Sequence, residues 1–266
     1  LAQIIIAALY FWSGVQKLNF TFSHETLPKL LEPLQILFPS IQFPFVFIGI
    51  GIALIEAFIG CGLLFRKTRN VAVVLAITMH TAILTVLIAK NYNSIVWIWN
   101  AVLIAIVVTA FWKNDVSIKQ ILDSANVKNW KIQAAKIITF ASVLLPILSF
   151  VGLWDSYLSG ALYSGNVAVG VVRINDDLFE KLPPKARQSV FQTKNGGEKM
   201  LPFVEWALSD LNVPAYPAQR VFEKVAGEIC NLADDQNQVE LIVKERPAIL
   251  DGKYNLMRTN CEKLGK

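Results

Sequence analysis

The sequence predicts an all-α polytopic transmembrane helix bundle followed by a small α+β domain outside the membrane. Hydrophobic residues make up 54% of the 266 residues and charged residues only 17%, with a mean hydropathy of +0.47. This composition is too apolar for an ordinary soluble domain and is typical of membrane spans. The composition becomes far more polar after Trp154. We therefore expect two domains, residues 1–154 and residues 155–266.

About five apolar stretches approach the roughly 20 residues that a helix needs to cross a bilayer. They cover residues 1–20, 44–65, 71–90, 95–112 and 137–154. The chain begins at Leu1 inside an apolar run, so we expect the first stretch to be cut short, as in a fragment; a removed signal peptide is the alternative. Pro146 lies within the fifth stretch and should kink it, because proline removes a helix hydrogen bond.

The distribution of cations predicts the orientation of the bundle. Residues 1–154 hold 11 Lys and Arg against 5 Asp and Glu, whereas residues 155–266 hold 14 against 15. Eight of the cations lie in segments 66–70 and 113–136. Cytoplasmic loops of membrane proteins carry an excess of Lys and Arg. We therefore expect both segments in the cytoplasm, and segment 21–43 and the C-terminal domain outside.

Two segments between the spans are expected to lie along the membrane surface. In segment 113–136, apolar residues recur at helical spacing from Ile118 to Ala125 with lysines between them, which favours a short helix on the inner surface. Segment 21–43 has three prolines among apolar residues. It is too broken to span and too apolar to stay in water, so we expect a lid in the outer interface.

The C-terminal domain is predicted to be a small water-soluble α+β domain with a core of its own. Cys230 and Cys261 both lie in it, and outside the cytoplasm they could form a disulfide; two buried thiols are the alternative. The expected elements are the strands Val167–Ile174 and Val239–Lys244 and the helices Phe203–Leu211 and Pro217–Leu232.

Two ionisable residues lie inside predicted spans. Glu56 and His80 are each nine residues from the inner end of their span, which places both roughly 13 Å deep at about 1.5 Å per residue. Small residues recur beside Glu56 at every fourth position, at Gly49, Ala53, Ala57 and Cys61. Such a ridge packs against another helix and should turn Glu56 inward. We expect Glu56 and His80 to pair, either as a structural hydrogen bond between two helices or as part of a functional site.

Three further candidate residues belong near the outer rim. Lys17 should lie about one helical turn from the water, where snorkelling to the headgroups alone would explain it. Asn100 and Trp99 lie at a similar depth in the fourth stretch. Asn100 and Trp99 could bind a cofactor in the same pocket as Lys17. Alternatively, they only pack in a contact between helices.

The segment Gly14-Val15-Gln16-Lys17-Leu18-Asn19 resembles the Gly-Val-Lys-Lys-Leu-Asp segment of vitamin K-dependent γ-glutamyl carboxylases. The similarity continues with Glu56 in an apolar run, Arg69 in a short loop and Met79-His80 in the next span. This succession is similar to that of the horizontally transferred transmembrane (HTTM) domain. A similar pattern occurs in the DoxX and MauE redox-associated membrane proteins. The resemblance covers about residues 8–112.

The resemblance implies work on a lipid-soluble quinone or quinol. In the carboxylases the second lysine of the segment acts as a base on vitamin K hydroquinone, and Lys17 matches it, whereas Gln16 replaces the first lysine. Lys17 is then a catalytic base, with Glu56 and His80 holding the bundle or relaying protons. We expect both to lie too deep to touch Lys17 unless the helices tilt strongly. The location that the resemblance implies is a bacterial inner membrane.

The chain also departs from the carboxylases. Their upstream spans, with a further functional histidine, have no counterpart here, and their lumenal region does not resemble residues 155–266. That domain is instead similar to bacterial HTTM- or DoxX-like proteins of unassigned activity. A non-catalytic accessory or assembly subunit of a larger membrane complex therefore stays open as an alternative. A transporter is third, because no pair of broken helices in matching halves supports it.

Several other classes of function are not supported by the sequence. No His and Cys cluster has metal-ligand spacing, and no nucleotide-binding loop occurs. No patch of basic and aromatic residues favours nucleic acid. The expected partners are the lipid bilayer and possible membrane-complex proteins, and the expected cofactor is a quinone or quinol, with no metal or nucleotide.

Overall fold

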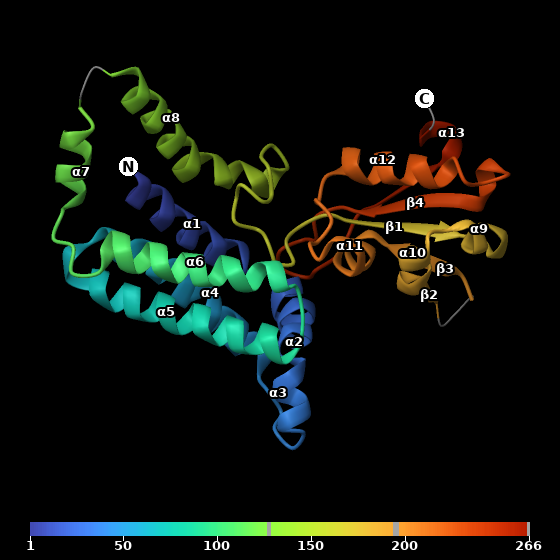
Figure 1. Ribbon diagram of the computed structural model, residues 1–266, viewed down its shortest axis with the longest axis horizontal. Helices are drawn as coiled ribbons and strands as arrows, with labels where there is room; N and C mark the ends of the chain where they lie inside the picture. Colours follow the sequence, from blue (N-terminus) through green and yellow to red (C-terminus); the bar gives the residue numbers. More distant parts are fainter. Residues whose placement is uncertain (127–128, 194–196, 265–266) are drawn as a thin grey trace. The chain divides into compact units, whose positions relative to one another are not determined.

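The computed structural model describes residues 1–126, 129–193 and 197–264. Contacts divide the chain into two compact units, a helical unit (Leu1–Asn166) and a sheet unit (Val167–Lys266). Figure 1 shows the long helices of the first unit and the sheet with flanking helices of the second. Residues 155–166, which open the C-terminal domain in the sequence prediction, belong by their contacts to the helical unit.

The helical unit holds long apolar helices joined by short ones. In chain order its α-helices are α1 (Ala2–Gln16), α2 (Leu27–Leu30), α3 (Glu32–Leu37), α4 (Phe45–Leu64), α5 (Arg66–Ala89), α6 (Ser94–Phe111), α7 (Ile118–Ser124) and α8 (Trp130–Leu144). A π-helical turn (Phe22–Thr26) precedes α2, and a 3-10 helix (Leu145–Val151) continues α8.

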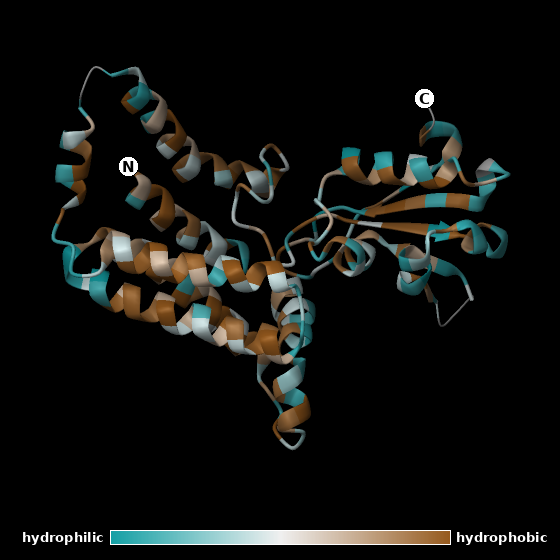
Figure 2. Ribbon diagram, in the orientation of Figure 1, coloured by the Kyte–Doolittle hydropathy of each residue, from teal (hydrophilic) through white to brown (hydrophobic). Residues whose placement is uncertain are grey.

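Four helical segments within the described residues are long and apolar enough to cross a membrane, namely α4, α5, α6 and Trp130–Val151. Their hydrophobic residues colour them brown along most of their length in Figure 2. Large apolar side chains stand exposed on them, as on surfaces that face lipid chains. The chain is thus consistent with an integral membrane protein. The expected count of about five spans is not confirmed, because α1 has only 15 residues.

Proline shapes the last span and the segment before α4 in different ways. The α-helical part of the last span ends at Leu144, and Pro146 lies in the first turn of the 3-10 helix that follows, so the expected disruption is found. In segment 21–43, Pro28 and Pro33 each occupy the first turn of a short helix, α2 and α3. Proline is tolerated there because its missing N–H would have no helical partner.

The two cationic segments meet at one end of the helical unit. Arg66 donates to Gln120 Oε1 over 3.0 Å, and the backbone N–H of Lys113 donates to Asn70 Oδ1 over 3.0 Å. The amphipathic helix expected in segment 113–136 is α7, which begins at a capping box formed by Ser117 and Gln120. The prediction that both segments lie on the same side of the bundle is therefore consistent with these contacts.

Helices α1 and α4 touch backbone to backbone. A Cβ atom added at Gly14 would lie 2.5 Å from the carbonyl oxygen of Ala53, and one at Gly60 would lie 2.6 Å from that of Ala7. The pairing of late α1 with early α4, and of early α1 with late α4, makes the two helices antiparallel. Small residues at these crossings allow the close approach.

The predicted ridge of small residues is confirmed in part. Ala53 is buried and its backbone faces Gly14, but Cys61 is exposed, and Gly60 makes the next contact with α1. Steps of four residues overshoot the helical repeat of about 3.6 by about 40° each. After Ala57 the next residue of α4 that faces α1 is therefore Gly60, three positions on, and not Cys61, four positions on.

The sheet unit contains an antiparallel five-stranded sheet in the order β2-β3-β1-β4-β5. Val172, Leu201 and Leu241 from the sheet form a core with Phe222 and Ala226 of α12. The strands are β1 (Val169–Ile174), β2 (Phe191–Gln192), β3 (Lys199–Pro202), β4 (Val239–Lys244) and β5 (Leu256–Asn260). The helices are α9 (Asp176–Lys181), α10 (Pro184–Ser189), α11 (Phe203–Leu211), α12 (Gln219–Cys230), a 3-10 turn (Gln236–Gln238) and α13 (Cys261–Leu264).

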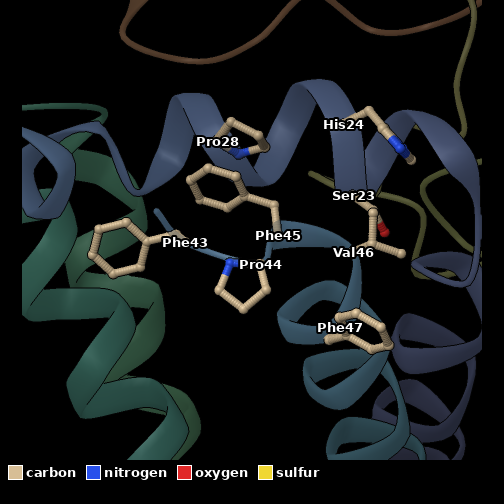
Figure 3. A pocket seen from close by; sticks show the side chains of 8 residues that line it. All are labelled: Ser23, His24, Pro28, Phe43, Pro44, Phe45, Val46 and Phe47. Carbon is tan, nitrogen blue, oxygen red and sulfur yellow. The ribbon is translucent and has the colours of Figure 1, made fainter. Parts of the chain in front are cut away.

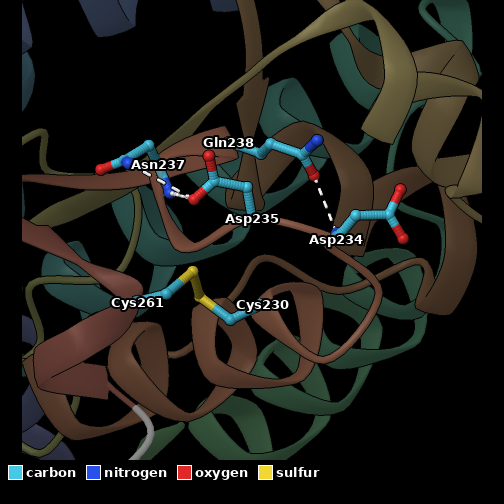
Figure 4. Close-up of a disulfide and its surroundings, with 6 residues drawn as sticks. All are labelled: Cys230, Asp234, Asp235, Asn237, Gln238 and Cys261. Carbon is cyan, nitrogen blue, oxygen red and sulfur yellow. Dashed lines mark hydrogen bonds between the residues drawn. A yellow bond between two sulfur atoms is a disulfide. The ribbon is translucent and has the colours of Figure 1, made fainter.

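A disulfide joins Cys230 at the end of α12 to Cys261 at the start of α13 (Figure 4). The sequence left the choice between a disulfide and two thiols open, and the structure shows the disulfide. A compact turn lies beside it, in which the backbone N–H of Asp234 donates to Gln238 Oε1 over 3.0 Å. The disulfide thus fastens the last described helix to the core of the sheet unit.

Candidate functional site

A buried ion pair connects α1 to α4. Lys17 Nζ donates to Glu56 Oε2 over 2.6 Å and to Ser13 Oγ over 2.8 Å. The side chains of Lys17 and Glu56 are only 12% and 9% exposed. The expectation that Glu56 lies too deep to touch Lys17 is wrong. Helical side chains point back towards the helix N-terminus, so Lys17 extends down α1 to Glu56.

A second buried chain of hydrogen bonds links α1, α5 and α6. His80 Nε2 lies 2.6 Å from the Tyr10 hydroxyl, and His80 Nδ1 lies 2.7 Å from Asn100 Oδ1. Asn100 Nδ2 donates to the Val96 carbonyl over 2.8 Å, which turns the amide oxygen towards His80. An amide oxygen only accepts, so Nδ1 of His80 carries the proton. The Tyr10 hydroxyl then donates to Nε2.

The expected pair of Glu56 and His80 is replaced by these two separate sets of contacts. Equal depth along two helices does not decide the direction in which each side chain points around its helix axis, and α1 supplies a partner to both. Both sets start from residues of α1, Lys17 in the ion pair and Tyr10 in the chain of hydrogen bonds. We refer to them together as the buried polar network.

Trp99 lies outside this network. Its side chain is 53% exposed, whereas the neighbouring Asn100 is 3% exposed, because consecutive helical residues point about 100° apart. The structure thus brings together Lys17, Glu56, His80 and Asn100 but not Trp99. Tyr10 and Ser13 also belong to the network, although they were not predicted from the sequence. Their spacing to Lys17, seven and four residues, places all three on one face of α1 and was the available signal.

The polar residues at the end of α1 bind the segment that closes the helical unit. The fully buried Gln16 donates to Ser149 Oγ over 2.8 Å and accepts from Asn166 Nδ2 over 2.7 Å. Asn19 donates to the Ser164 carbonyl over 2.9 Å and accepts from the Phe22 N–H over 2.8 Å. The segment Gly14–Asn19 therefore has a structural role in this fold, whatever chemistry it carries.

A pocket of about 370 Å³ lies beside the π-helical turn and the start of α4 (Figure 3). Its polar side chains are those of Ser23 and His24, and the others are aromatic, aliphatic or proline. His24 stacks on Phe20 with ring centroids 3.7 Å apart, and its Nδ1 lies 2.9 Å from the Phe20 carbonyl. The lining residues are Ser23, His24, Pro28, Phe43, Pro44, Phe45, Val46 and Phe47.

The described residues contain no group of three or more His, Cys, Asp or Glu side chains that could hold a metal ion. The fold is consistent with an α-helical integral membrane protein, and ionisable side chains are buried among its helices. No family model, no curated protein and no solved structure matches this chain.

Proposed function

We propose that this membrane protein works with a lipid-soluble quinone or quinol, as the resemblance to HTTM- and DoxX-type proteins implies. The observation that supports the proposal is the buried ion pair of Lys17 and Glu56, next to the Tyr10–His80–Asn100 chain. Ionisable side chains inside membrane spans are costly to bury and commonly mark proton or substrate pathways. A quinol that gives its two electrons to an external one-electron acceptor, such as ferricyanide, also releases two protons, and this network can receive a proton from it.

Within the ion pair, Glu56 is the group ready to accept a proton. The Lys17 ammonium group already carries three hydrogens and has no lone pair, whereas a carboxylate oxygen only accepts. Lys17 can act as the base only after it has passed a proton to Glu56. We therefore propose that Lys17 and Glu56 act together, with Lys17 supplying positive charge where a quinol hydroxyl loses its proton.

The Tyr10–His80–Asn100 chain is a second candidate site for accepting a proton. When Nδ1 of neutral His80 donates to Asn100, Nε2 is the unprotonated ring nitrogen. Nε2 accepts a hydrogen bond from the Tyr10 hydroxyl. His80 can therefore take up a proton when the Tyr10 hydroxyl rotates away or passes its own proton to Nε2. This makes Tyr10 the residue that controls the availability of His80.

The proposed location is a bacterial inner membrane, with segments 66–70 and 113–136 in the cytoplasm and the sheet unit outside it. This proposal is supported by the contacts of Arg66 with Gln120 and of Lys113 with Asn70, which join the two cationic segments at one end of the bundle, as expected of cytoplasmic loops. The disulfide between Cys230 and Cys261 suits an oxidising compartment.

Quinol oxidation in nanodiscs, with ferricyanide as the electron acceptor, tests the proposed function. We expect Lys17→Ala and Glu56→Gln to reduce the rate at least about 100-fold, the lower range for a general base. Lys67→Ala, which changes an exposed lysine of α5, is the matched control and should keep the rate. Full activity of a folded Lys17→Ala protein would exclude the proposed role of the pair.

The second candidate function is an accessory or assembly subunit of a larger membrane complex. Two observations favour it: the polar residues of segment Gly14–Asn19 have internal partners, and the sheet unit is a compact body of its own. Extraction in a gentle detergent should then recover partners in fixed stoichiometry. Isolation of the chain only as a free monomer would count against this function.

A further inference from the structure

We propose that the pocket beside Ser23 and the start of α4 binds a neutral, lipid-soluble ring that carries carbonyl oxygens, of the quinone class. This inference rests on the proposed function for its ligand class. It goes further because it assigns the ligand to a site that contains no residue of the buried polar network. The Lys17 ion pair is itself almost closed to the surroundings.

Ser23 supplies the first polar contact of this site. The residue is 5% exposed and lines the pocket, and its hydroxyl has no hydrogen-bond partner within the described part of the chain. A Cβ atom at Gly49 would lie 2.7 Å from Ser23 Oγ. The absence of a side chain at Gly49 therefore leaves room for the Ser23 hydroxyl. The hydroxyl is therefore available to an acceptor atom of a ligand in the pocket.

The first turn of α4 adds backbone donors. The helix begins at Phe45 with Pro44 as its N-cap, which makes no side-chain hydrogen bond. The N–H of Phe45 donates to the Phe43 carbonyl, but the amides of Val46 and Phe47, in the first turn, lack partners inside the helix. Both residues line the pocket. The site therefore combines a hydroxyl with backbone amides, all of them neutral donors.

The lining decides between classes of ligand. None of the eight residues that line this pocket is Lys or Arg, and the ring of His24 already stacks on Phe20 with its Nδ1 at the Phe20 carbonyl. The phosphate of a lipid headgroup would therefore lack the Lys or Arg that usually binds it. A carbonyl oxygen needs only neutral donors. Phe43 and Phe45 stack at a centroid distance of 5.9 Å, and such aromatic surfaces favour a flat ring. About 370 Å³ is near the lower limit for ligand pockets and suits a compact ring.

The position of the pocket connects it to the lipid and to the buried network. Val46 and Phe47, which line the pocket, are 39% and 77% exposed and would face the lipid from which the ligand comes. Gly49, beneath Ser23, precedes Glu56 by seven residues on α4, which is a rise of about 10 Å. A ring in the pocket would thus lie at the N-terminal end of α4, at least about two helical turns from Glu56.

Photolabelling of the full-length protein tests this site. The probe is an aryl-azide derivative of methyl-naphthoquinone, and the protein is in phosphatidylcholine nanodiscs. We expect labelled peptides from residues 23–28 and 43–47, with labelling removed by excess unmodified methyl-naphthoquinone. Labelling confined to other peptides, or equal competition by phosphatidylglycerol, would overturn the assignment.

Two variants of the pocket sharpen the test. Val46→Trp should fill the pocket and abolish labelling, whereas Leu54→Trp, at an exposed position of the same helix, should not. Ser23→Ala should weaken the apparent affinity about three- to tenfold, as expected for one hydrogen bond. Ser142→Ala, which changes a half-buried serine of α8 outside the pocket, should leave it unchanged. If folded Val46→Trp and Ser23→Ala proteins label like the wild type, the site is refuted.

The outcome also separates this site from the proposed function. Labelling of the pocket without quinol oxidation would support the binding site and contradict the redox function. Quinol oxidation with labelling only around Lys17 would support the function and overturn the pocket.

Discussion

Lys17 Nζ at the end of α1 and Glu56 Oε2 in the middle of α4 lie 2.6 Å apart. This contact depends on the backbone contact between the same two helices at Gly14 and Ala53. Because both side chains are nearly buried, neither charge can be solvated if its partner is removed. The ion pair therefore couples the stability of the α1–α4 contact to the protonation of the proposed site.

Removing one charge of the pair should destabilise the protein more than removing both. Glu56→Gln leaves the Lys17 ammonium buried without a counter-charge and should cost about 3–5 kcal/mol. The double variant Lys17→Met, Glu56→Gln should recover most of this loss. Thermal unfolding in detergent measures both. If the double variant is as unstable as the sum of the single ones, the two side chains do not interact.

Glycine at the crossing of α1 and α4 should be indispensable. Gly14→Ala and Gly60→Ala each place a methyl group against the backbone of the other helix and should cost about 1–3 kcal/mol. Gly51→Ala is the control, because a Cβ atom at Gly51 meets nothing within 4 Å. It should be neutral or stabilising by up to about 1 kcal/mol. Equal effects of all three substitutions on the unfolding temperature would contradict the crossing.

The tautomer of His80 is open to direct observation. The chain has two histidines, so a His24→Gln variant leaves His80 as the only source of imidazole signals in ¹⁵N NMR. We expect a protonated Nδ1 and an Nε2 that accepts a hydrogen bond from Tyr10. Tyr10→Phe should move the Nε2 signal, and Asn100→Leu should change the tautomer. An unchanged spectrum in both variants would refute the hydrogen bonds of His80 with Tyr10 and Asn100.

The thiol count of the native protein should be one. Cys230 and Cys261 are bonded and Cys61 is exposed, so alkylation without reductant should modify one cysteine and alkylation after reduction should modify three. The double variant Cys230→Ser, Cys261→Ser should lose about 2–4 kcal/mol of stability. Modification of three cysteines in unreduced protein isolated from the membrane would refute the disulfide in the cell.

The contact between α3 and the end of α5 should depend on pH. The Lys90 ammonium donates to Glu32 over 2.6 Å and lowers the pKa of that carboxyl below its ordinary value of 4.5. A lowered pKa means that the contact contributes fully above pH 4.5 and is lost as the pH falls through the lowered pKa. Hydrogen exchange of α3 should therefore accelerate only in acid. In Lys90→Ala it should already be fast at neutral pH.

The sequence predicted the elements better than the site. Hydrophobic periodicity and polar composition located α11 and β4 at the bounds that the structure shows. The apolar stretches contain all of α4 and most of α5 and α6. The start of α8 was missed, because its first turns carry two lysines and fall below the apolar threshold of a span. Asn129 caps the helix there, a local signal that hydropathy does not register.

Composition and periodicity by themselves determined that apolar helices dominate residues 1–154, that cations gather in two segments, and that a polar α+β domain follows. These are properties of short stretches of chain, because each depends on how neighbouring residues partition between lipid and water. Only the tertiary structure decided that Lys17 binds Glu56, that Tyr10 joins His80 to Asn100, and that Trp99 stays outside. Those contacts depend on the rotation of each helix about its axis and on the backbone contact at Gly14, which no local pattern contains.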